Sequence, residues 1–214
     1  MKICYYGHSC FQFTTKTGGR ILTDPYQRVG YELPKRLQAD IVTVSHEHFD
    51  HNYVEAVNAK NILRNSGTYH IDQMQFEAIE SYHDPMHGKL RGKNLIFKMY
   101  IDGLTICHLG DLGEELSEDL IKKIGQVDVL LLPIGGTYTI DAKQAKEYAQ
   151  AIMPKMVVLM HFKPQDGTLD IATPDAFLEL NNADTIQYVD REVEITVENI
   201  EEYKDKIILM ERCK

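Results

Sequence analysis

The first half of the chain consists mainly of short apolar and β-branched runs separated by polar turns, a pattern that predicts strands. The expected strands are Lys2–Tyr6, Cys10–Thr15, Arg20–Thr23, Ile41–Val44, Leu95–Ile101 and Leu104–Leu109. Two of the turns carry clear signals: Gly18-Gly19 supplies residues that tolerate positive φ, and Asp102-Gly103 is a strong two-residue hairpin signal. We therefore expect a β-rich first half with hairpins.

The second half alternates between strands and helices. The expected strands are Val127–Pro133, Met156–Met160, Ile186–Val189 and Val193–Val197. A helix is predicted over Asp141–Ile152, with Asp141 as the N-cap, Gln144 at the capping-box position and Pro154 beyond its end. A second helix is predicted from Thr173 to Leu180, with Thr173 as the cap. No linker interrupts the chain, so residues 1–214 are expected to form one layered α/β or α+β domain with helices outside packed sheets.

Composition narrows the function classes. The chain has 23 Lys and Arg against 32 Asp and Glu, a net charge of −9, which argues against a nucleic-acid partner. Since no apolar run approaches the ~20 residues of a membrane span, and no secretory signal is evident, no membrane span is expected. The four cysteines form no CxxC pair, which favours reduced thiols and a cytoplasmic location.

One short segment concentrates metal-ligand chemistry. His46-Glu47-His48-Phe49-Asp50-His51 holds three imidazoles and an aspartate directly after the predicted strand Ile41–Val44. In an irregular loop these side chains can converge on one point, because a loop does not alternate them between two faces. Imidazole nitrogen and carboxylate oxygen suit Zn²⁺, Mn²⁺ or Fe²⁺, and no thiolate is offered. The segment therefore predicts a metal site.

This segment, read as His46-x-His48-x-Asp50-His51, resembles the signature of the metallo-β-lactamase-fold hydrolases. Three further residues match positions of that superfamily in the right order: Asp24, Asp111 and His161. The stretches 7–11 (GHSCF) and 133–137 (PIGGT) resemble the branch that includes ascorbate-6-phosphate lactonase and the N-acyl-phosphatidylethanolamine phospholipases. The matches span positions 8 to 161, about three quarters of the chain.

The resemblance implies an αββα sandwich with a dinuclear metal site at one edge. His46 and His48 are expected to hold one ion with a third histidine. Asp50, His51 and His161 are expected to hold the second, and Asp111 to bridge both. The implied cofactors are two divalent ions, Zn²⁺ first and Mn²⁺ or Fe²⁺ as alternatives. A water between such ions is the nucleophile, so Asp50 and Asp111 are the expected catalytic carboxylates.

The third histidine of the first ion is not fixed by the sequence. His83 follows an expected strand end, 35 residues after His48, and is the preferred candidate. His87 and His70 remain alternatives, and Asp84 could instead be the ligand or a turn cap.

Further residues are candidates for supporting and substrate-binding roles. Asp24 and His108 are expected to orient the ligands, because metal-bound imidazoles usually donate their free N–H to an acceptor. The candidate substrate contacts are His8, Thr137, Tyr138 and Lys163. Arg91, Lys93 and Lys163 could neutralise an anionic small-molecule substrate.

The predicted function is a metal-dependent hydrolase that attacks an ester, lactone, amide or phosphoester of a small molecule. The alternatives are a nuclease of the same fold and a non-catalytic, metal-stabilised binding domain. A catalytic site leaves one metal position open to water, whereas a structural site closes all of them. The oligomeric state is not predicted.

Overall fold

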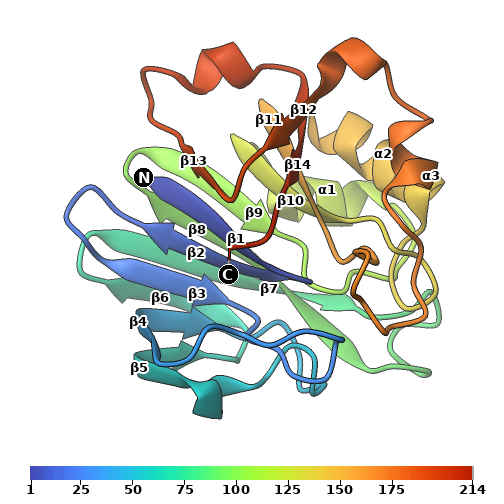
Figure 1. Cartoon of the computed structure of the whole chain (residues 1–214). Coiled ribbons are helices and arrows are strands. Elements are labelled where there is room, and N and C mark those ends of the chain that lie inside the picture. The colour runs from blue at the N-terminus through green and yellow to red at the C-terminus, as the bar shows by residue number, and fades with distance from the viewer. Residues whose placement is uncertain (214) are drawn as a thin grey trace.

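Two β-sheets packed face to face form the body of the computed structural model, which describes residues 1–213 (Figure 1). The six-stranded sheet has the order β13-β1-β2-β3-β4-β5 and the eight-stranded sheet the order β12-β14-β11-β10-β9-β8-β7-β6. The strands of the first sheet are β1 (Lys2–Gly7), β2 (Cys10–Thr14), β3 (Arg20–Thr23), β4 (Leu37–Thr43), β5 (Val57–Leu63) and β13 (Glu192–Glu194). Those of the second are β6 (Gly67–Ile71), β7 (Met74–Tyr82), β8 (Lys93–Ile101), β9 (Leu104–His108), β10 (Val129–Pro133), β11 (Met156–Met160), β12 (Ile186–Val189) and β14 (Lys206–Met210).

Both sheets are mixed, and their parallel parts matter most for function. In the first sheet β3, β4 and β5 run parallel, and in the second β9, β10, β11, β14 and β12 do. Parallel strands place their carboxyl ends at one edge of the sheet, where ligand-binding loops gather.

The two outer faces are covered differently. The helices α1 (Glu118–Ile124), α2 (Ala142–Ile152) and α3 (Asp175–Leu178) lie together beside β10 and β11, on the outside of the second sheet (Figure 1). The first sheet is covered by the loop 24–36 and the 3-10 turn η1 (Val54–Ala56), where Tyr26 and Val29 pack on Leu22 and Val42. Two more 3-10 turns, η2 (Ala183–Thr185) and η3 (Ile200–Tyr203), follow α3 and β13. The expected α/β sandwich is confirmed.

Alternation of side chains explains how one sheet serves two cores. In β3 and β4, Ile21 and Ile41 are buried between the sheets, whereas their neighbours Leu22 and Val42 belong to the outer cluster. This is the period of two that strands impose. Every residue of β10 and β11 is buried, because parallel strands inside a sandwich are covered on both faces.

The strongest local signals in the sequence are confirmed. The hairpin β8–β9 pairs Ile101 with Leu104 across Asp102-Gly103. Helix α2 begins after Asp141, whose carboxylate accepts hydrogen bonds from two backbone N–H groups of the first turn, and Gln144 completes the capping box.

Several elements were predicted wrongly or missed. Thr173 does not cap α3, because the Thr173 hydroxyl donates a hydrogen bond to the Asp175 carboxylate instead. The helix begins after Pro174 and has no side-chain cap. The strand expected over Val193–Val197 is only the three residues of β13. The strands β5, β6 and β14 and the helix α1 were not predicted, and of β7 only the end before His83 was expected. Strands β5 and β6 are largely exposed and lack a continuous apolar pattern.

The prediction of four reduced thiols is wrong for two of them. Cys4 in β1 and Cys213 form a disulfide across 209 positions of sequence, while Cys10 and Cys107 are free and buried. Sequence spacing could not reveal this bond, because it depends on the C-terminal segment returning to β1 (Figure 1). The disulfide ties the two ends of the described chain together.

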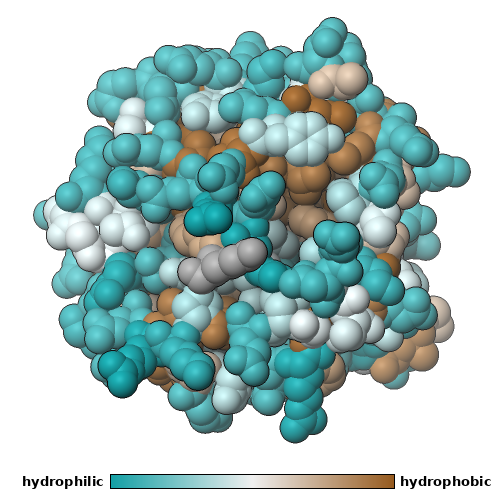
Figure 2. Space-filling model, in the orientation of Figure 1, coloured by the Kyte–Doolittle hydropathy of each residue, from teal (hydrophilic) through white to brown (hydrophobic). Residues whose placement is uncertain are grey.

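The surface is mostly hydrophilic on the face shown in Figure 2, and hydrophobic residues gather in its upper part, over β12 and β14. Among residues 1–213, no helix has the length and apolar character needed to cross a membrane.

Candidate metal centre

Six separate segments bring the predicted site residues to one edge of the sandwich. These residues come from the β1–β2 turn (His8), the end of β3 (Asp24), the loop after β4 (His46, His48, Asp50, His51), the end of β7 (His83), the loop after β9 (Asp111) and the end of β11 (His161). Most of these positions follow the carboxyl end of a strand, and both sheets contribute. The site therefore depends on the packing of the two sheets.

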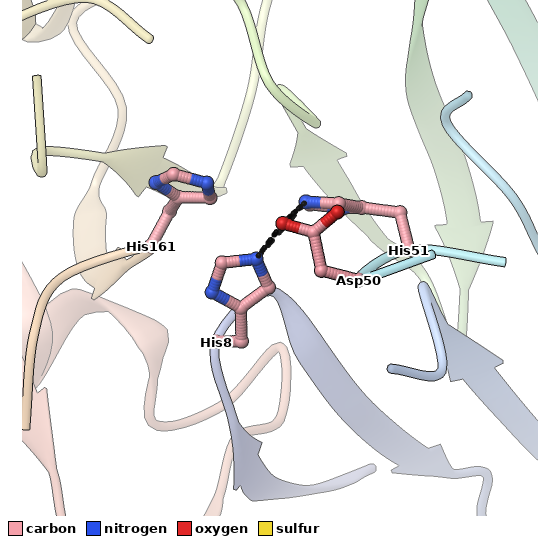
Figure 3. Close-up of side chains that lie close together, drawn as sticks. All are labelled: His8, Asp50, His51 and His161. Carbon is pink, nitrogen blue, oxygen red and sulfur yellow. Dashed lines mark hydrogen bonds and ion pairs between the residues drawn. The ribbon is translucent and has the colours of Figure 1, made fainter. Parts of the chain in front are cut away.

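The side chains form two groups that could each hold a metal ion. His46, His48 and His83 place one nitrogen each within 4.8 Å of one another. The second group consists of Asp50, His51, His161 and also His8. Figure 3 shows the second group with the four side chains turned toward a common centre.

Asp111 lies between the two groups. Its Oδ2 is 3.1 Å from Nε2 of His51 and 3.2 Å from Nε2 of His161, both in the second group. The same oxygen is 3.3 Å from Nε2 of His83 in the first group. One carboxylate thus contacts imidazoles of both groups, as the bridging role inferred from the resemblance requires.

Several buried polar atoms of this cluster have no hydrogen-bond partner. They are Nε2 of His46, Oδ1 of Asp111, Nδ1 of His83 and both ring nitrogens of His161. Buried polar atoms are almost always satisfied, and each one left without a partner costs free energy. A divalent cation would use these lone pairs, so the residues present fit a metal of the N/O-binding kind.

Burial and neighbouring charges set the protonation of several groups in the cluster. Burial lowers the pKa of His46 and of His83, so both are neutral near pH 7 and keep a lone pair for a cation. Burial alone would raise the pKa of Asp111, but the adjacent imidazoles of His161 and His51 hold it well below its usual range. The pKa of His51 is raised despite burial, because the carboxylates of Asp111 and Asp24 stabilise its charged form.

Asp24 is linked to two of the imidazoles, to one directly and to the other through Ser45. Its Oδ2 lies 2.8 Å from Nδ1 of His51 and accepts a 2.6 Å hydrogen bond from the hydroxyl of Ser45. The Ser45 oxygen is in turn 2.9 Å from Nδ1 of His46. Both imidazoles therefore carry a proton on Nδ1 and direct Nε2 into the cluster. Ser45 was not predicted, although it directly precedes the histidine-rich segment.

His108 and Asn94 support the backbone around the site rather than its side chains. Nε2 of His108 lies 2.8 Å from the carbonyl of Ser9, and its Nδ1 accepts a hydrogen bond from the Gly110 N–H. The side chain of Asn94 accepts a hydrogen bond from the Asp111 N–H at 2.9 Å. His108 thus links the two segments that carry His8 and Asp111. No sequence motif marks Asn94.

Of the three candidates for the third histidine, the structure places only His83 in the cluster. His87 is exposed and lies edge-on to the ring of Tyr82, and His70 is exposed on β6. The neighbour of His83, Asp84, is fully buried and accepts hydrogen bonds from four backbone N–H groups of residues 86–91. These bonds stabilise the loop that follows the candidate ligand.

A groove of about 450 Å³ opens beside the first group, lined by His46, His48, Arg64, Arg91 and Lys93 among others. The guanidinium of Arg91 lies 5.6 Å from the ring centre of Tyr138. Among the expected substrate contacts, Tyr138 is thus next to the groove. Thr137 is exposed. Lys163 does not line this groove; it lines a separate small pocket together with His8.

Comparison with known proteins identifies the family of this chain. Residues 2–161 match the family described as "Beta-lactamase superfamily domain". A UPF0173 metal-dependent hydrolase of Thermoplasma acidophilum is 30% identical over 207 residues, which cover 84% of this chain and 90% of that protein. A UPF0173 metal-dependent hydrolase of Carboxydothermus hydrogenoformans is 28% identical over 192 residues, 76% of this chain and 84% of that protein.

Solved structures show the same relationship. A Thermotoga maritima chain classed with the zinc-dependent hydrolases of the metallo-beta-lactamase superfamily is 33% identical, with a TM-score of 0.80 over 98% of this chain and 97% of that one. The metallo hydrolase Igni18 of Ignicoccus hospitalis shares the fold, with a TM-score of 0.67 at 22% identity over 100% of this chain and 96% of that one. This chain therefore belongs to the metallo-beta-lactamase superfamily, within the UPF0173 family of metal-dependent hydrolases.

Proposed function

We propose that the chain hydrolyses a small molecule at a dinuclear centre held by two groups of side chains. The first ion would be held by His46, His48 and His83, the second by Asp50, His51 and His161, with Asp111 between them. The observation that carries the proposal is the position of Asp111, whose Oδ2 lies within 3.3 Å of imidazole nitrogens from both groups. A purely structural site would not need a carboxylate shared in this way.

When bound, two divalent ions bring the pKa of a water between them toward neutrality and polarise the bond to be cleaved. Zinc suits the nitrogen-rich donor set, and Mn²⁺ or Fe²⁺ are alternatives.

The chain's own groups have defined tasks in this proposal. Asp50 and Asp111 are the catalytic carboxylates, and both remain ionised near pH 7. For Asp50 this holds although burial alone would raise its pKa, because the hydrogen bond from His8 and the imidazole of His51 lower it overall. An ionised carboxylate can accept a hydrogen bond from the attacking water and orient it. Asp24 acts as a positioning residue through His51 and Ser45.

We further propose a substrate that carries a negative charge. The groove beside His46 and His48 holds three basic side chains, and two of them have acidic neighbours: Arg64 with Glu47 and Lys93 with Glu80. Among residues 1–213, no carboxylate lies within ion-pair distance of Arg91. Arg91 is therefore available for a phosphate or carboxylate, with Tyr138 beside it, and Thr137 and Lys163 are further proposed contacts.

The test of the activity uses purified, metal-loaded protein with lactones, phosphodiesters and acyl amides as substrates. The variant His48→Ala should lose at least about 100-fold in kcat/KM together with bound metal, since losing a ligand costs more than losing a supporting residue. His48 is exposed, so the fold should persist. His70→Ala, an exposed histidine on β6, is the matched control and should behave like wild type.

The test of the substrate charge is a comparison of KM values. Arg91→Ala should raise KM for anionic substrates and leave KM for neutral ones unchanged. An equal rise for both classes would contradict the proposed anion contact.

Two wider expectations belong to the same proposal. Residues 1–214 act as one hydrolase domain, supported by the contribution of both sheets to the site. A cytoplasmic location stays a prediction. The disulfide Cys4–Cys213 means that reduced thiols no longer support this location.

A further inference from the structure

His8 occupies a position that its sequence context did not indicate. Its imidazole is almost fully buried, and its Nε2 lies 3.1 Å from Nε2 of His51 and 3.2 Å from Oδ2 of Asp50 (Figure 3). The ring centre of His161 is 4.3 Å from that of His8. His8 is therefore inside the second group of side chains rather than beside it.

The atoms that meet here are all lone-pair donors once they are deprotonated. Asp24 accepts the Nδ1 proton of His51, so Nε2 is the atom of His51 left for a cation. A carboxylate oxygen of Asp50 and Nε2 of His8 face the same point. Only shared protons or a cation can hold three such atoms together.

The spacing of these atoms suits ligands of one ion. With metal–nitrogen bonds of about 2.0–2.1 Å and the angles of about 90–120° between neighbouring ligands of a five-coordinate ion, two ligand atoms lie about 2.9–3.6 Å apart. The separations of 3.1 and 3.2 Å around His8 lie within this range.

The backbone holds His8 in this position. Its carbonyl accepts a 2.8 Å hydrogen bond from the His161 N–H and a 3.1 Å bond from the hydroxyl of Tyr5. His8 has a φ of 54°, in the left-handed region that few non-glycine residues adopt. Strained backbone of this kind persists only where the surroundings enforce it, and it concentrates at functional sites.

We propose that Nε2 of His8 is a further protein ligand of the second ion, in addition to Asp50, His51 and His161. The inference rests on the proposed dinuclear centre and replaces the substrate contact expected for His8 from the sequence. With Asp111 shared, the second ion would have five protein ligands and the first ion four. The second site should therefore bind its metal more tightly and fill first.

The first test is a zinc titration of three proteins: wild type, His8→Gln and His8→Ala. Glutamine keeps an N–H donor for Asp50 but lacks the imidazole. If His8 is a ligand, both variants should weaken the tighter site by more than about 100-fold, beyond the effect typical of supporting residues. Wild-type affinity in His8→Gln would overturn the proposal, because the histidine would then serve only as a donor. His70→Gln is the matched control.

The second test needs no variant and so does not depend on folding of a mutant. Wild-type protein with ¹⁵N-labelled histidine is loaded with ¹¹³Cd and observed by NMR. A coupling between cadmium and Nε2 of His8 is expected, alongside couplings for His51 and His161. Couplings for those two without one for His8 would overturn this inference alone, whereas the absence of bound metal would overturn the proposed function itself.

Discussion

Replacing Asp24 with asparagine should weaken metal binding at the second site without removing any ligand. The amide oxygen can still accept the hydrogen bond from the Ser45 N–H, which is 2.8 Å from Oδ1. The amide NH₂ then faces Nδ1 of His51, where Oδ2 now lies at 2.8 Å. Two N–H donors cannot face each other, so the imidazole must move its proton to Nε2, the atom that should bind the ion.

The size of this effect follows from the role of such partners. Loss of a residue that orients a metal ligand typically costs 10–100-fold in metal affinity, about 1.4–2.7 kcal/mol. The metal-free protein should also lose about 1.5–3 kcal/mol of unfolding free energy, the contribution of a hydrogen bond to a charged group.

The assay combines chelator-competition titration of the metal with denaturant unfolding of the metal-free protein. Asp40→Asn is the matched control, because Asp40 also accepts a backbone N–H, from Arg20, but lies near the surface with an exposed Lys60 as partner. It should change metal affinity by less than twofold. Wild-type metal affinity in Asp24→Asn would refute the tautomer argument.

Three further predictions concern stability. Leu131→Ala should lower the free energy of unfolding by about 2–5 kcal/mol, because Leu131 is fully buried in β10. Ile62→Ala, at a position 41% exposed, is the control and should cost less than about 1 kcal/mol. Equal losses in denaturant unfolding would contradict the burial of Leu131 in the core. Reduction of the Cys4–Cys213 disulfide should cost about 2–5 kcal/mol in wild type and nothing in Cys213→Ser, and a reductant without effect on wild type would show that the bond is absent in solution. In the metal-free protein, burial lowers the pKa of His8 to about 4, so below about pH 6.5 the unfolded chain takes up a proton that the folded chain does not. Between pH 7 and pH 4, wild type should therefore lose about 3 kcal/mol more unfolding free energy than His8→Gln. Parallel curves of unfolding free energy against pH for the two proteins would contradict this prediction.

Local signals in the sequence predicted local structure well. The Asp102-Gly103 hairpin and the capping box at Asp141 depend on neighbouring residues only, and both are present. Strands β5 and β6 escaped prediction, because exposed strands are stabilised by their partners and need no apolar pattern.

The candidate site could be predicted only where its residues are neighbours in the sequence. The segment from His46 to His51 is contiguous and therefore visible, whereas the partnership of Ser45 with Asp24 exists only once β3 and β4 are side by side. The position of His8 within the second group likewise depends on the β1–β2 turn meeting the end of β11. Contacts between distant segments are set by packing, which spacing along the chain does not record.

Anomalous X-ray scattering from crystals grown with zinc or manganese would locate the bound ions themselves. Two peaks are expected, one among His46, His48 and His83 and one among Asp50, His51 and His161, both in contact with Asp111. A single peak away from Asp111, or none at full metal excess, would contradict the proposed dinuclear centre.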